Sequence, residues 1–195
     1  DARRLRRALE GFAEDAEDAD VAVIYYSGHG IEAGGENYLV PIDADLSALE
    51  NAGEKLVRLS EIVDELQKTI PVTIVMLDAC RSNPFPPGAV VKAEPSERGA
   101  PVGSGGLGAA RGAVSLAATS ARAENYGTVI GFAAEPGQVA LDGAPGSNSP
   151  YAAAILRHLG AMEGAEFGTV MRMVAEEVYL KTGGRQRPWV NESLS

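Results

Sequence analysis

The residues best suited to chemistry are a cysteine and a histidine that each follow an apolar run. Cys80, the single cysteine, comes after the run 72–77, and His29 comes after the run 21–27. Runs of this kind are typical of buried strands. Catalytic groups collect at the carboxyl ends of parallel strands, so we expect the two side chains to meet at one sheet edge. A thiol beside an imidazole predicts a cysteine hydrolase, with Cys80 as nucleophile and His29 as acid–base partner.

Both residues also have ordinary explanations. A lone cysteine is more often a small buried apolar residue, and a lone histidine is commonly a surface group. Their context argues against this. We expect Cys80 just past its strand, followed by the polar segment 81–84, whose arginine favours the thiolate. His29 lies between Gly28 and Gly30, which let a substrate backbone approach and permit unusual dihedral angles.

The composition fits one globular domain and excludes several classes of function. The 195 residues are 45% hydrophobic and 23% charged, the balance of a domain with an ordinary core. A net charge of −10 and a pI of about 4.7 argue against nucleic acid or a membrane as partner. No apolar run reaches the roughly 18–20 residues of a membrane span. One cysteine excludes an internal disulfide, and His29, His158 and Cys80 lack the spacing of metal ligands.

The elements that position these residues alternate between strands and helices. We expect strands at 21–27, 38–41, 72–77, 113–118, 128–133 and 187–190. We expect helices at 3–19, 59–66 (with Ser60 as N-cap), 151–159 and 167–178. This order predicts an α/β fold with a mostly parallel sheet, in which the strand at 21–27 is covered on both faces. The Gly- and Pro-rich stretch 86–112 is expected to be a long flexible loop.

The segments around the two candidate residues resemble a known family. Segment 27–30 (Ser-Gly-His-Gly) resembles the histidine motif of caspases, and 78–81 (Asp-Ala-Cys-Arg) resembles their cysteine motif. The separation of about 50 residues also matches. The longer segments 25–41 and 78–85 resemble bacterial caspase-like proteases, which are relatives of metacaspases. The resemblance covers most of the chain outside 86–112.

The resemblance implies a fold and a boundary. It implies a caspase-like three-layer sandwich, with helices on both faces of the sheet and one catalytic domain over residues 1–195. Caspase-like domains begin with a strand, a helix and a second strand, which have no counterpart before the helix expected at 3–19. We therefore expect an N-terminally truncated domain.

The resemblance also implies a mechanism. Cys80 would attack the scissile carbonyl, the backbone N–H groups of Cys80 and Gly30 would form the oxyanion hole, and His29 would protonate the leaving amine. Neither a third catalytic side chain nor a cofactor is implied. Several metacaspases respond to calcium, but no EF-hand-like loop is present in the sequence.

Two aspartates predict the substrate preference. Asp78 stands where caspases have a glutamine, and Asp142 stands where they have an arginine that binds substrate aspartate. Both changes make the pocket anionic, so we expect peptide or protein substrates cleaved after Arg or Lys. The other reading of Asp142 is a turn residue before Gly143. Ala140 and Leu141 match positions that line the substrate groove, where main-chain hydrogen bonds hold an extended peptide.

Three basic residues lie in the stretch 86–112, where caspase-like enzymes carry a linker that is often cleaved. An enzyme with an anionic pocket would itself cut after Lys92, Arg98 or Arg111. The alternative is an ordinary solvated insertion.

Two other functions compete with a peptidase. One is a catalytically inactive caspase-like interaction module, which the presence of both Cys80 and His29 disfavours. The other is a cysteine hydrolase of non-peptide amides, which Asp78 and Asp142 disfavour. A cytoplasmic location is favoured, and an upstream signal stays open because the chain begins with Asp1 rather than Met.

Overall fold

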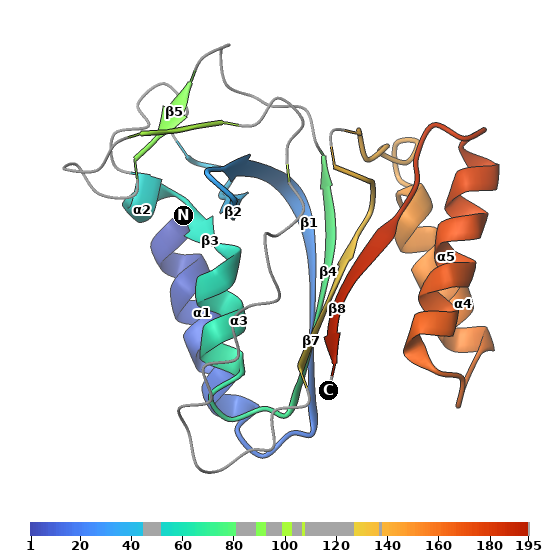
Figure 1. Cartoon of the computed structure of the whole chain (residues 1–195), viewed down its shortest axis with the longest axis horizontal. Coiled ribbons are helices and arrows are strands. Elements are labelled where there is room, and N and C mark those ends of the chain that lie inside the picture. Colours follow the sequence, from blue (N-terminus) through green and yellow to red (C-terminus); the bar gives the residue numbers. More distant parts are fainter. Residues whose placement is uncertain are drawn as a thin grey trace.

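The described part of the chain forms a six-stranded sheet between two layers of helices (Figure 1). The computed structural model describes residues 1–44, 52–80, 89–92, 99–102, 107, 127–136 and 138–194. The strand order is β3 (Val57–Arg58), β2 (Glu36–Val40), β1 (Val21–Ala33), β4 (Val72–Cys80), β7 (Gly127–Phe132) and β8 (Trp189–Leu194). One face carries α1 (Ala2–Asp15) and α3 (Leu59–Leu66), and the other carries α4 (Pro150–Ala161) and α5 (Phe167–Lys181). A short α2 (Ala52–Lys55) precedes β3. The expected three-layer α/β sandwich is confirmed.

The three central strands are parallel, and the outer strands are antiparallel. β1 pairs with β4 and β4 with β7 in parallel, whereas β2, β3 and β8 join in antiparallel register. β4 and β7 are covered on both faces. Leu77 of β4 packs in the core under α1 and α3, while Met76 packs in the core under α4 and α5. This two-sided cover explains why their sequences are continuous apolar runs.

The first half of β1 departs from this pattern. Among the described residues, no strand pairs with the second edge of β1 before His29, where β2 begins. Val21, Val23 and Tyr25 on its α4 side are 47%, 49% and 44% exposed. The expectation of a strand covered on both faces is therefore wrong for this half, in which only the alternate residues Ala22, Ile24 and Tyr26 pack into the core on the α1 side.

Both key strands are longer than the apolar runs indicate. β1 continues to Ala33 because β2 folds back on it through a turn at Gly34 and Gly35, which have φ of 65° and 91°. β4 continues to Cys80 because β1 supplies pairing partners that far. Cys80 is therefore the last residue of a strand rather than a residue beyond it.

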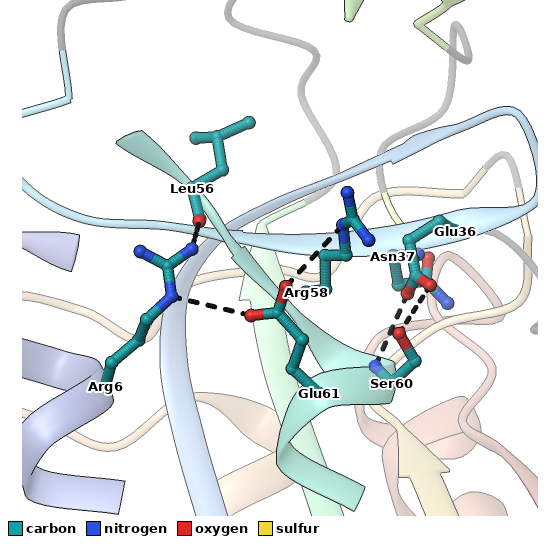
Figure 2. A network of polar contacts seen from close by, with 7 residues as sticks. All are labelled: Arg6, Glu36, Asn37, Leu56, Arg58, Ser60 and Glu61. Carbon is teal, nitrogen blue, oxygen red and sulfur yellow. Dashed lines mark hydrogen bonds and ion pairs between the residues drawn. The ribbon is translucent and has the colours of Figure 1, made fainter. Parts of the chain in front are cut away.

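A polar network fixes α1, β2, β3 and α3 to one another (Figure 2). Arg6 of α1 donates to the backbone carbonyl of Leu56 at 2.6 Å and forms an ion pair with Glu61 of α3 at 3.5 Å. Ser60 is not the N-cap of α3, which is Arg58. Its hydroxyl donates instead to Glu36 of β2 at 2.6 Å, a tertiary contact that no local pattern predicts.

The stretch expected to be a loop contains a small hairpin. β5 (Val90–Val91) pairs with β6 (Ala100–Pro101) in a separate two-stranded sheet. Val91 is 2% exposed and packs with Ile31 and Ala33 of β1. Strands of two residues are too short to give a recognisable period in sequence. The strand expected at 113–118 lies outside the described residues.

Candidate active site

His29 and Cys80 occupy directly paired positions of neighbouring parallel strands. The register joins Ser27 to Asp78, Gly28 to Ala79 and His29 to Cys80. Neighbouring strands are about 4.8 Å apart, so this pairing brings the two positions together without any loop. Residues two apart share a face of a strand, so position 80 lies on the same face as Asp78 and position 29 on the same face as Ser27.

The glycines beside His29 make room for packing on the opposite face. A Cβ on Gly28 would meet the Tyr26 hydroxyl at 2.7 Å, and a Cβ on Gly30 would meet Leu107 at 2.7 Å. The Tyr26 hydroxyl donates to the His29 carbonyl at 2.9 Å, which steadies the strand at the histidine. Neither glycine has a positive φ, so the expected unusual dihedral angles are not found.

A pocket of about 770 Å³ opens beside these positions, between β1, β4 and α4. Asp78 and Asp142, far apart in sequence, both line it. Asp78 is 6% exposed at its wall, whereas Asp142 is exposed on the loop after β7. The volume of this pocket is that of a site for a substrate side chain or small ligand. Tyr25, Ser27 and Ser149 also line it.

The loop 142–149 forms one wall of this pocket and is tightly folded. A Cβ on Gly143 would meet the Asn148 carbonyl oxygen at 2.2 Å, so the loop closes on itself where only glycine fits. Ser147 donates to the Ala144 carbonyl through its amide at 2.8 Å and its hydroxyl at 2.7 Å. Sequence reasoning missed this wall, although its Gly, Pro, Ser and Asn content is a turn signature.

The two expected groove residues do not line the pocket. Ala140 is 3% exposed and packs in the core under α4 and α5. The Leu141 amide donates to the buried Gln186 side chain at 3.0 Å, and the Gln186 amide group donates to the Ala133 carbonyl at 2.9 Å. Gln186 therefore ties the segment before Asp142 to the end of β7, a positioning role that its sequence context gives no sign of.

The remaining candidates lie elsewhere. Lys92, half-buried, follows β5 of the hairpin, while Arg98 and Arg111 lie outside the described residues. His158 of α4 is bound to Glu177 of α5, with 2.7 Å between Nε2 and Oε2, so it joins two helices rather than serving the pocket.

Neither a metal cluster nor a spanning helix is found in the part of the chain that the structure describes. No group of three or more His, Cys, Asp or Glu side chains there is arranged to hold a metal ion. No helix in the same part is both long and apolar enough to cross a membrane.

Comparison with known proteins decides the family. A family model described as "Caspase domain" (Peptidase_C14) matches residues 1–195, the whole chain. The chain belongs to the caspase family. It is a cysteine peptidase domain, of a family whose members act on protein substrates and generally need no cofactor.

Solved caspase structures support the same assignment at the level of the fold. The chain is similar to caspase-1 from Spodoptera frugiperda, with a TM-score of 0.58 and 15% identity, over 97% of this chain and 67% of that one. It is also similar to pro-sf-caspase-1, with a TM-score of 0.56 and 15% identity, over 100% of this chain and 70% of that one. No curated protein sequence matches. The predicted caspase-like fold is confirmed, while the likeness to bacterial metacaspase relatives stays a prediction.

Proposed function

We propose that this caspase domain is an endopeptidase that cleaves after arginine or lysine, using Cys80 as nucleophile and His29 as acid–base partner. The observation that carries the preference is the buried carboxylate of Asp78 at the pocket wall, two residues before Cys80 on the same strand. The hydroxyl groups of Tyr25 and Ser149 donate to this carboxylate but carry no positive charge, and a substrate guanidinium or ammonium supplies one.

The geometry supports a two-step mechanism. The Cys80 thiolate attacks the scissile carbonyl carbon, forming a carbon–sulfur bond and an oxyanion that accepts hydrogen bonds from the Cys80 and Gly30 amides. As the carbon–nitrogen bond breaks, His29 gives its proton to the leaving amine. His29 then takes a proton from water, which attacks the thioester carbon; the carbon–sulfur bond breaks, and the acid is released with the Cys80 thiolate restored beside protonated His29. The adjacent register of positions 29 and 80 supports direct transfer between these groups.

Four peptides that differ only in the residue before the scissile bond test this proposal. We expect kcat/KM for Arg and Lys to exceed that for Gln and Asp by about 100-fold, since a close buried charge pair is worth roughly 2–5 kcal/mol. Preferential cleavage after Asp would refute the anionic pocket. If no peptide is cleaved and an arginyl electrophile leaves Cys80 unlabelled, the domain is a non-catalytic interaction module.

We further propose that the domain cuts its own segment 86–112. Lys92 directly follows β5 of the hairpin, so a cut after it leaves the buried Val91 in its strand. Intact-mass spectrometry of purified protein is expected to detect cuts after Lys92, Arg98 or Arg111 in the wild type. The Cys80→Ala protein is expected to stay whole. An uncut wild type would support a simple solvated insertion.

A further inference from the structure

Two hydroxyl groups converge on one oxygen of the pocket carboxylate. The Tyr25 hydroxyl donates to Asp78 Oδ2 at 2.6 Å, and the Ser149 hydroxyl donates to the same oxygen. Tyr25 comes from β1 and Ser149 from the start of α4, so the contact joins three elements around the pocket. All three residues line the pocket.

We propose that Tyr25 and Ser149 are positioning residues that fix which oxygen of Asp78 meets the substrate. A carboxylate oxygen accepts about two hydrogen bonds, and these donors supply two at Oδ2. Oδ1 is then the oxygen that receives the substrate cation. This inference rests on the proposed preference for basic residues and extends it to the manner of recognition.

The chain of bonds continues into the backbone of α4. Ser149 is the N-cap of this helix, and its oxygen accepts from the Ala152 amide at 2.9 Å. One hydroxyl therefore accepts from the helix and donates to Asp78. Bonds in such a chain strengthen one another in a partly buried site. The result is a carboxylate whose rotation is limited from the sheet side and from the helix side.

Tyr25 is suited to act only as a donor here. Partial burial of its hydroxyl and the neighbouring Asp78 carboxylate raise the pKa of Tyr25 well above its ordinary value. The phenol therefore keeps its proton at physiological pH. A neutral phenol at this position adds no second negative charge beside the carboxylate.

A carboxylate held in this way offers one oxygen rather than two. Side-on pairing with a guanidinium uses both oxygens, whereas an ammonium needs one. We expect wild-type protein to cleave matched Arg and Lys peptides with kcat/KM values within about tenfold of each other. Replacing Tyr25 by Phe frees one hydrogen-bonding position on Asp78 Oδ2, so the ratio of kcat/KM for the Arg peptide to that for the Lys peptide is expected to rise. The Asp78 carboxylate is then less firmly oriented, which is expected to raise KM for both peptides.

The test combines Tyr25→Phe, Ser149→Ala and Ser149→Thr with Arg, Lys and Gln peptides. Tyr25→Phe and Ser149→Ala are expected to raise KM for the basic peptides about tenfold with kcat changed less than about twofold. The Gln peptide, which carries no cation, is expected to be unaffected. Ser149→Thr keeps the hydroxyl and is expected to restore KM. Tyr179→Phe, a tyrosine on the exposed side of α5, is the matched control.

The possible failures are distinguishable. If wild-type protein shows no preference for Arg and Lys over Gln, the proposed function fails and the positioning role falls with it. If wild type prefers basic peptides but Tyr25→Phe leaves KM unchanged, the positioning role alone is refuted. An equal loss for all three peptides, with a fall in melting temperature, means that the hydroxyls only stabilise the fold and also refutes it. A wild-type preference for Arg over Lys above about 100-fold refutes recognition through one oxygen.

Discussion

Replacing Cys80 by alanine is expected to lower kcat/KM for an arginyl peptide by at least about 10⁴-fold, because no other group supplies the attacking electron pair. His29→Ala is expected to lose roughly 10²–10⁴-fold, the usual worth of an acid–base group. The double variant should be little worse than Cys80→Ala, since the two residues act as a unit. Steady-state kinetics of purified variants measure these losses.

The control for this result is the integrity of the fold. Both positions lie in paired strands, where a substitution could disturb the sheet. The melting temperature and elution volume of each variant must therefore match those of the wild type. Wild-type protein is expected to react with an arginyl electrophile at Cys80, and Cys80→Ala is expected not to react. Activity that persists in a correctly folded Cys80→Ala protein would rule out the cysteine mechanism.

Replacing Asp78 by asparagine is expected to lower kcat/KM for Arg and Lys peptides by about 100-fold, mainly through KM, because the substrate cation loses a buried counter-charge. The asparagine oxygen can still accept from Tyr25 and Ser149, so the pocket keeps its shape. The Gln peptide should be cleaved as before. Parallel kinetics with the three peptides measure the change.

Asp142→Asn is the matched comparison, because it removes the same charge from the exposed loop of the same pocket. An exposed ion pair contributes about 0–1 kcal/mol, so the expected loss is about fivefold or less. A larger loss for Asp142→Asn than for Asp78→Asn would reverse this ranking. The substrate cation would then bind at the mouth of the pocket rather than at its wall.

Features that depend on spacing along one element could be predicted from the sequence. The apolar runs before His29 and Cys80 predicted two strands, and their common edge came from the rule for parallel sheets. Asp78 was predicted from the resemblance of 78–81 to the cysteine motif of caspases, and the structure puts it on the same face of the strand as position 80. Local pattern was therefore enough to bring His29 and Cys80 to one edge of the sheet, and the resemblance added Asp78.

The hydrogen-bond partners of Asp78 could not be predicted from the sequence, because they lie far from it along the chain. Tyr25 and Ser149 are 53 and 71 residues away in sequence; the pairing of β1 with β4 brings Tyr25 to Asp78, and the packing of α4 on the sheet brings Ser149 to the same oxygen. The same holds for Gln186, whose bond to Leu141 spans 45 residues. The hairpin of β5 and β6 could not be predicted because its strands are two residues long.

The pairing of β4 with β7 determines what a cut in the intervening stretch would produce. Six positions of β4, Val72–Leu77, pair with Gly127–Phe132, and the buried Leu107 packs in the same core as Leu77. Breaking one peptide bond between these strands leaves their hydrogen bonds and shared core in place. The nicked molecule would run as two bands under denaturing conditions and as one particle under native conditions. Its halves are thus complementary pieces of one sheet, and separately made fragments would be expected to reassemble.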